Sequence, residues 1–178
     1  RPDGSIVLTQ TGLIDKVLAA SGLEDCKPNL MPASAQALGS DPDGPPMDES
    51  WNYLSILGML LYLSTNTRPD ISFAVSQAAR FSAAPKQSHA TAVKSIIRYL
   101  KRTRTQGTII RPTGKLDLDL YVDADFAGLF RQEPDGIPES VKSRTGYVIM
   151  LSNCPLLFKS VLQNSISAST EEIASRLC

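Results

Sequence analysis

The spacing of apolar residues changes near residue 116, and this change limits the folds that the chain can adopt. From residue 51 to about residue 104, apolar side chains recur every three or four positions, as on one face of an α-helix. From Leu116 to Ala124 they alternate with polar side chains, which is the period of a β-strand with one buried face. We therefore expect the α+β class, with a helical unit followed by an incomplete mixed α/β domain.

Three helices are expected in the helical part. The first, "ESWNYLSILGMLLYLS", is apolar on almost every side, which predicts a buried helix. Pro69 separates it from the second, "DISFAVSQAARFS", for which Asp70 is the expected N-terminal cap. The third is "QSHATAVKSIIRYLKRTR", whose predicted core face consists of Val93, Ile96, Ile97 and Leu100.

The remaining segments set the expected domain boundaries. Residues 5–9 predict a short strand, and a helix follows from Thr9 or Thr11 to near Gly22. Residues 27–50 contain five prolines and no apolar period, which indicates a linker. Near the end, "TGYVIMLS" and "CPLLFKSVL" predict a hairpin, and "SASTEEIASRLC" begins like a helix. The expected parts are therefore residues 1–26, 27–50, 51–115 and 116–178.

Positive charge is concentrated in the middle of the chain, although the net charge is zero. Residues 71–116 contain nine basic residues and no acidic one. Within this segment, one face of the third helix carries Lys94, Arg98, Lys101 and Arg102. Such a face can bind a phosphate backbone, and the alternative interpretation is a solvated helix surface.

Carboxylates are concentrated on the alternating strand, whose polar side carries Asp117, Asp119, Asp123 and Asp125. A divalent cation relieves repulsion among carboxylates, and pairs of such cations hydrolyse phosphodiesters. The alternative is the solvated outer face of a half-buried strand. The single histidine, His89, has no second ligand at a suitable spacing, so we expect a helix-start residue and not a metal ligand.

Five stretches, in this order along the chain, resemble one family: "LLYLSTNTRPDISFAVSQAARF", "HATAVKSIIRYLKRT", "YVDADFAG", "SRTGYVIMLSNCPLLFKS" and "LQNSISASTEE". They resemble the C-terminal part of Copia-type retrotransposon polyproteins, in which the palm and thumb of the reverse transcriptase lead into RNase H. The resemblance implies that residues 1–26 are the end of the palm. It also implies that residues 51–115 are the thumb or connection region, and that residues 116–178 are a truncated RNase H-like domain.

The resemblance also implies roles for single residues. Asp123 matches the first metal-binding aspartate of the RNase H fold, whose cofactor is Mg²⁺, whereas Asp125 belongs to the same motif without being a usual ligand. The family's catalytic glutamate, also a metal ligand, falls on Ala174 without a gap and on Glu172 after a two-residue deletion. The basic face of the third helix would bind an RNA–DNA hybrid or a template-primer duplex.

The activities implied by the resemblance are RNA-directed DNA synthesis and hydrolysis of RNA in RNA–DNA hybrids. We expect the polymerase aspartates upstream of Arg1 and the last RNase H carboxylates beyond Cys178, so this fragment is expected to be catalytically inactive. The incomplete domain should leave the apolar side of its sheet partly uncovered.

We expect an intracellular chain, cytoplasmic or nuclear, that associates with the rest of the polyprotein and not with a membrane. A domesticated, non-enzymatic module that binds nucleic acid or protein, and a non-functional remnant, are the alternatives.

Overall fold

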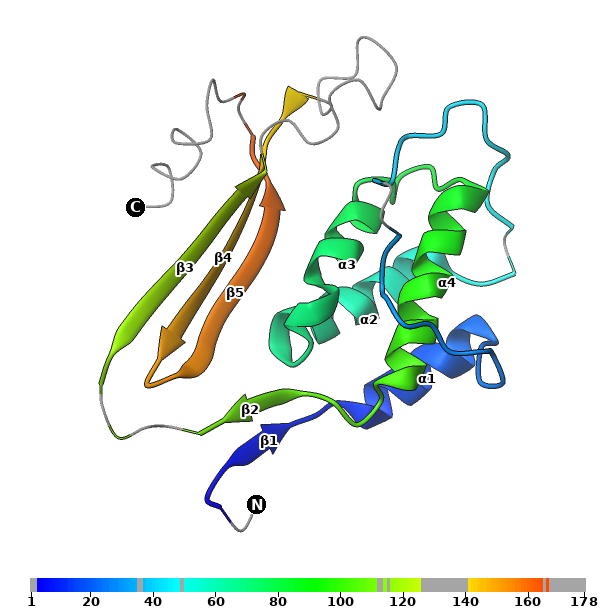
Figure 1. Ribbon diagram of the computed structural model, residues 1–178. Helices are drawn as coiled ribbons and strands as arrows, with labels where there is room; N and C mark the ends of the chain where they lie inside the picture. Colours follow the sequence, from blue (N-terminus) through cyan, green and yellow to red (C-terminus); the bar gives the residue numbers. More distant parts are fainter. Residues whose placement is uncertain are drawn as a thin grey trace. The chain divides into compact units, whose positions relative to one another are not determined.

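The computed structural model of the chain describes residues 3–34, 37–48, 50–111, 114, 116–125, 141–164 and 166. The chain divides into two compact units. The helical unit is Leu8–Thr108, and the sheet unit combines Arg1–Val7 with Ile109–Cys178. Figure 1 labels the elements of both units, which are described separately below.

The helical unit contains the expected helices. They are α1 (Thr11–Ser21), α2 (Tyr53–Asn66), α3 (Ser72–Ala79) and α4 (Gln87–Arg102), with a short 3-10 turn, η1 (Pro69–Ile71), before α3. Gly22 ends α1 in the left-handed conformation at φ 64°, which glycine adopts without strain. The Asn52 side chain accepts a hydrogen bond from the Ser55 amide at 2.9 Å and so caps α2.

The core of this unit lies between the four helices and confirms the predicted face of α4. Val93, Ile96, Ile97 and Leu100 are all buried there. The prediction that the α2 segment is buried on nearly every side is wrong, because Leu54 and Tyr62 are 62% and 58% exposed. Asp70 does not cap α3 either, since no side chain caps that helix. Its carboxylate instead accepts hydrogen bonds from Arg68 and Tyr99.

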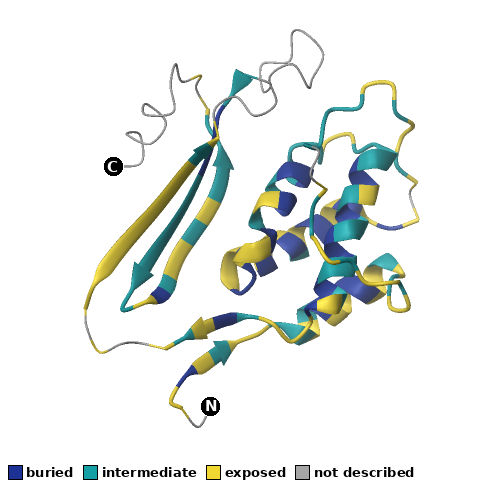
Figure 2. Cartoon of the chain, viewed as in Figure 1, coloured by how far each residue is buried: buried dark blue, intermediate teal, exposed yellow. Residues whose placement is uncertain are grey.

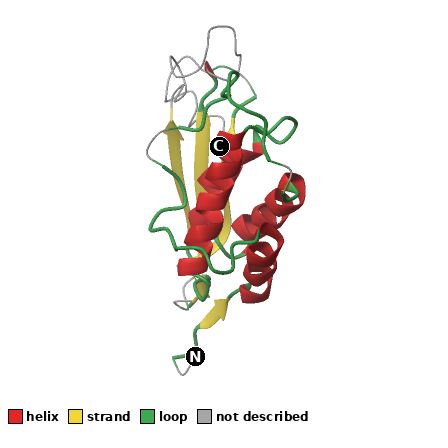
Figure 3. Ribbon diagram, turned by 90° about the vertical axis from the view of Figure 1, so that its right-hand side faces the viewer, coloured by secondary structure: helices red, strands yellow, loops and turns green. Residues whose placement is uncertain are grey.

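In the long segment that joins α1 to α2, the described residues form no helix. We call its described residues, 23–34 and 37–48, the strap. The regular secondary structure described in the strap is one isolated antiparallel bridge, between Pro46 and Lys86. It is nevertheless attached to the unit, because Leu38 and Met47 pack against the core. In Figure 3 the strap is drawn as loop.

Two short strands, β1 (Ile6–Leu8) and β2 (Thr108–Ile110), pair with each other. The first was expected from the sequence, whereas β2 falls in the region predicted to be helical and is too short to show a period. Gly107 permits the approach of the two segments, because a Cβ added there would lie 1.9 Å from the Leu8 carbonyl oxygen. A side chain at position 107 is therefore incompatible with this pairing.

The sheet unit contains an antiparallel sheet of order β3-β4-β5, formed by β3 (Leu118–Asp125), β4 (Arg144–Leu151) and β5 (Cys154–Leu162). Ser152 and Asn153 turn the β4–β5 hairpin with φ angles of 51° and 62°, as type I′ turns require. On the apolar side, Leu118 and Leu120 are 68% and 49% exposed, which agrees with the expectation of an uncovered face. Figure 2 shows the exposed residues along β3.

Candidate nucleic-acid interface and acidic strand

The basic face of α4 is formed as the helical period predicts. Lys94, Arg98, Lys101 and Arg102 are separated by four, three and one positions, so they lie on one side of the helix, away from its buried face. The first three are partly buried and Arg102 is exposed. Lys101 and Arg102 also lie in the last turn of α4, where positive charge interacts favourably with the helix dipole.

The strap supplies partners to two of these cations. The Arg98 Nε donates to the Lys27 carbonyl at 2.6 Å. The Lys101 Nζ donates to the Cys26 carbonyl at 2.9 Å and also to the Glu24 carbonyl. These acceptors are backbone oxygens of a segment whose apolar residues show no regular spacing, so no sequence pattern predicts them.

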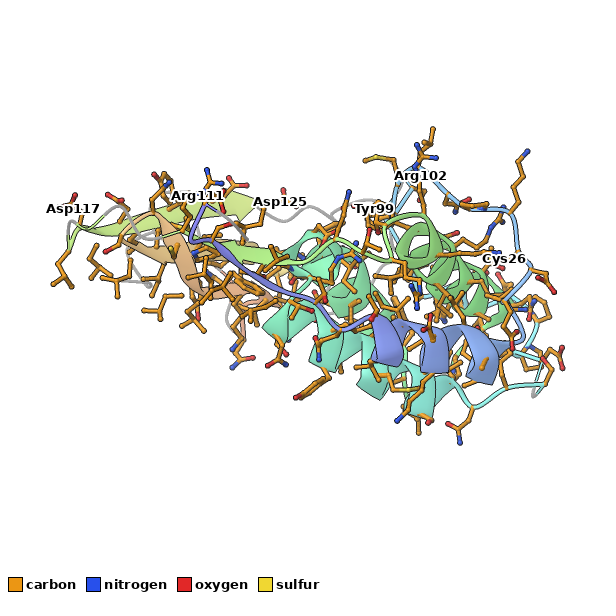
Figure 4. All side chains as sticks on the ribbon, turned by 90° about the horizontal axis from the view of Figure 1, so that it is seen from below. Cys26, Tyr99, Arg102, Arg111, Asp117 and Asp125 are labelled. Atoms are coloured by element: carbon orange, nitrogen blue, oxygen red, sulfur yellow. The ribbon has the colours of Figure 1, made fainter. Side chains whose placement is uncertain are left out.

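The other two cations have different surroundings. The Lys94 Nζ lies 6.0 Å from the centre of the Trp51 ring, within range of a cation–π interaction. Arg102 makes no hydrogen bond or ion pair with the described residues, and Figure 4 shows its side chain together with those of Tyr99 and Cys26. Arg102 is therefore the member of the basic face that is most accessible to a polyanion.

A charge network around the buried Arg68, beside the basic face, was missed by sequence reasoning. Arg68 binds Asp70 through two hydrogen bonds of 2.9 and 2.7 Å, and it also donates to the Thr103 carbonyl and hydroxyl at 3.1 and 2.6 Å. Tyr99 donates to the same Asp70 carboxylate at 2.8 Å. The network thus links the α2–η1 junction to the last turn of α4. Its signal in the sequence is the motif "TRPD", which by itself predicts a helix break and an N-terminal cap at Asp70.

The network shifts the pKa of both acids in it. Burial raises the pKa of Asp70, but the hydrogen bonds from Arg68 and Tyr99 and the charge of Arg68 outweigh burial and hold that pKa below its usual range. Burial and the neighbouring Asp70 carboxylate together raise the pKa of the Tyr99 hydroxyl. Asp70 is therefore ionised and Tyr99 is a neutral donor at physiological pH.

The acidic side of β3 is solvent-exposed. Asp123 pairs in register with Gly146, and Asp125 pairs with Arg144. Side chains on the same side of a strand recur about every 7 Å, so neighbouring carboxylates along β3 are too far apart to chelate one ion closely. Gly146 has no side chain, so it adds no side-chain ligand opposite Asp123.

Comparison with known proteins finds relatives of the chain among transposon proteins. The retrovirus-related Pol polyprotein from transposon RE1 of Arabidopsis thaliana is 32% identical over 95% of this chain and 11% of its own length. The uncharacterized mitochondrial protein AtMg00810 of Arabidopsis thaliana is 30% identical over 98% of this chain and 68% of its own length. The chain is thus similar to a segment of the retrovirus-related Pol polyproteins of transposons, and for this similarity we call it the Pol segment.

The secreted RxLR effector protein 161 of Plasmopara viticola is also similar to this Pol segment, with 34% identity over 67% of the segment and 79% of the effector. No family model and no solved structure matches the chain. The Pol segment spans 11% and 10% of the RE1 and RE2 polyproteins, so it corresponds to a small part of each.

Possible metal ligands are spread over the described residues of the Pol segment. Among them, no group of three or more His, Cys, Asp or Glu side chains is close enough to hold a metal ion. Asp123, for which the sequence resemblance implies a role as metal ligand, lies in the described part of the chain, whereas Glu172 and Ala174 lie outside the described residues. Of the helices in the described part, none has the length and apolar character needed to cross a bilayer.

His89 of the Pol segment has the structural role that was predicted. At the start of α4, its Nδ1 accepts a hydrogen bond from the Lys86 amide at 2.9 Å. Its Nε2 lies 2.9 Å from the Gly39 carbonyl, and its ring stacks on Phe81 at 4.1 Å between centroids. Both ring nitrogens are therefore engaged within the fold, and His89 joins the strap to α4.

Proposed function

We propose that this Pol segment is of the Copia type and connects the reverse transcriptase thumb to the first part of RNase H. The observation that carries the proposal is the basic face of α4, within a helical unit that precedes an antiparallel sheet whose first strand contains Asp123. The order of the five motifs supports the same assignment. In this proposal the helical unit contacts an RNA–DNA hybrid or a template-primer duplex inside the cell, in the cytoplasm or nucleus.

The proposed contact is to the phosphate backbone and is independent of base sequence. Arginine and lysine side chains on one helix face neutralise phosphates and release counterions, so the affinity falls as salt rises. Arg102 would make the first contact because it is exposed and has no partner among the described residues. Since each phosphate contact changes the salt slope by about −0.9 in B-form DNA, loss of Arg102 should reduce the slope by about one.

We also propose that the segment by itself does not cleave RNA. In RNase H enzymes Mg²⁺ activates water and stabilises the leaving oxygen, which requires several converging carboxylates. The described residues contribute Asp123 to such a set. Asp123 would act within a larger assembly, in which the rest of the polyprotein supplies the other ligands.

The proposal is tested by titrating the purified chain with a labelled RNA–DNA hybrid at low and moderate salt, in the presence of Mg²⁺. We expect salt-sensitive binding that is weakened severalfold by Arg102→Glu. Lys16→Glu on α1 is the matched control, because it makes the same charge change at an exposed residue outside the α4 face. Equal loss of affinity in both variants would show a general charge effect and would contradict the proposed interface.

The same samples, run on a gel, test the absence of cleavage. We expect no RNA product with the parent chain. Cleavage that disappears in Asp123→Asn would show that a working metal site assembles around this strand, and the proposed lack of activity would be wrong.

A stand-alone binding module is a second candidate function. The segment covers 68% of AtMg00810 and 79% of the effector from Plasmopara viticola, so this region makes up most of some proteins. As a module, the chain should fold and bind the hybrid with an affinity that does not increase when neighbouring polyprotein segments are added. A chain that neither folds nor binds would instead be a remnant.

A further inference from the structure

The strap lies against the helix face that the proposed function requires. Between residues 24 and 48, its described residues contain five acidic side chains, those of Glu24, Asp25, Asp41, Asp43 and Asp48, and one basic side chain, that of Lys27. An acidic segment therefore covers the basic helix of the same unit. The opposite charges of the strap and of α4 favour their association. The basic face is therefore partly occupied by the strap and is not fully open to a ligand.

At the C-terminal end of α4 the contacts involve the proposed phosphate ligands themselves. Carbonyl oxygens of Glu24, Cys26 and Lys27 accept hydrogen bonds from Lys101 and Arg98. The Asn29 amide in turn donates to the Arg98 carbonyl at 3.2 Å. A carbonyl oxygen and a phosphate oxygen compete for the N–H donors of these two side chains, so the contacts occupy part of the donor capacity that bound nucleic acid would use.

At the N-terminal end of α4, the strap makes more hydrogen bonds than at the C-terminal end. None of them involves a side chain of the basic face. The Gln87 amide donates to the Pro45 carbonyl at 3.0 Å, and the Met47 amide donates to the Pro85 carbonyl at 3.2 Å. His89 bonds to Gly39, and the Ser88 hydroxyl donates to Asp41 at 2.6 Å. With Met47 also packed against the core, this end of the strap is the anchored one.

We propose that residues 24–29 of the strap are an autoinhibitory latch over the basic face of α4, which a nucleic-acid backbone displaces in order to engage Arg98 and Lys101 fully. The inference rests on the proposed function of that face. Displacement frees Arg98 and Lys101 for phosphate contacts, while the anchored end of the strap stays on α4. The apparent affinity is then the intrinsic affinity reduced by the fraction of molecules in which the latch is open.

The affinity test uses a substitution that weakens the latch and leaves every cation in place. Asn29→Pro removes the amide that donates to Arg98, because proline has no N–H. One hydrogen bond contributes modestly, so we expect Asn29→Pro to bind the RNA–DNA hybrid about fivefold more tightly than the parent chain. Met31→Pro is the matched control, since Met31 is exposed and its amide makes no hydrogen bond within the described residues.

Amide hydrogen exchange of the parent chain provides a second readout that needs no variant. On saturation with the hybrid, exchange at the Asn29 amide should accelerate about tenfold or more, because its acceptor is lost. Exchange at the Met47 amide, in the anchored part, should remain slow.

The outcomes separate the latch from the proposed function. Hybrid binding with equal affinity in Asn29→Pro and Met31→Pro, or with the Asn29 amide still protected, overturns the latch and leaves the proposed function intact. If none of the chains binds the hybrid, the proposed function fails, and the latch fails with it. Tighter binding by Asn29→Pro, together with faster exchange at Asn29, supports both.

Discussion

Arg68 is the most deeply buried cation described in the chain, with 2% of its surface exposed. A buried guanidinium is tolerated when its donors are satisfied, and here Asp70 and Thr103 accept from it on two sides. The aromatic ring of Tyr99, 5.6 Å away, adds a cation–π contact. Loss of one partner would leave the charge buried and incompletely compensated.

We predict that Asp70→Asn destabilises the helical unit by roughly 2 kcal/mol, because it leaves the buried guanidinium of Arg68 without its charged partner, although Asp70 itself is 36% exposed. Urea unfolding followed by circular dichroism measures this loss. Asp15→Asn is the control, because the Asp15–Arg104 pair is exposed on both sides and its loss should leave the urea midpoint nearly unchanged.

The pH dependence should follow the same residue. Since the pKa of Asp70 is lower in the folded chain, its contribution is complete above about pH 4, where an unfolded aspartate ionises, and is lost as the pH falls through the folded pKa. The difference in urea midpoint between the parent chain and Asp70→Asn should therefore shrink on acidification. A difference that stays constant down to pH values below the folded pKa would contradict this assignment.

At the level of elements, sequence periodicity predicted the longer helices and the β4–β5 hairpin. Their apolar positions repeat over enough residues to define a face, as Val93 to Leu100 show in α4. β2 has three residues, which are too few to show a repeating pattern.

In the candidate site, the basic face was predicted from the charge pattern alone. The hydrogen bonds between the strap and α4 could not be predicted, because their acceptors are backbone carbonyls at positions such as Cys26 and Lys27. Every residue has such a carbonyl, so the side-chain sequence does not mark these positions.

The β1–β2 pair depends on one glycine. We predict that Gly107→Ala destabilises the chain, because the new Cβ would overlap the Leu8 carbonyl and force the paired backbones apart. The urea midpoint should fall, whereas Gly58→Ala should raise it slightly, since Gly58 is an exposed position inside α2 with open space at its Cβ. Unchanged stability of Gly107→Ala would mean that the two strands are not held in this register.

At the scale of the whole molecule, the apolar core is distributed unevenly. The core cluster of buried hydrophobic residues lies entirely between Ile14 and Leu100, in the helical unit. In the described part of the sheet unit, Cys154 is the buried hydrophobic residue, while Leu118 and Leu157 are exposed. Burial of apolar area is the main source of stability, so the two units should differ in their resistance to unfolding.

We predict that amides in β4 exchange with solvent much faster than amides in α4. Mass-spectrometric hydrogen exchange, with peptides covering Arg144–Leu151 and Gln87–Arg102, measures this difference. The helical unit should also retain its protection at urea concentrations at which the strands have lost theirs. Simultaneous loss of protection in both peptides would indicate one cooperative unit.

The close approach of Leu8 and Gly107 has a consequence for how this chain can be rearranged. The two positions are almost a hundred residues apart in sequence, yet their backbones meet, so the helical unit begins and ends at one place. A unit of this form can be circularly permuted: a short glycine linker could join its ends, and new termini could be opened in an exposed loop. The same closure would let the unit be inserted into, or removed from, a longer polypeptide without stretching the chain on either side.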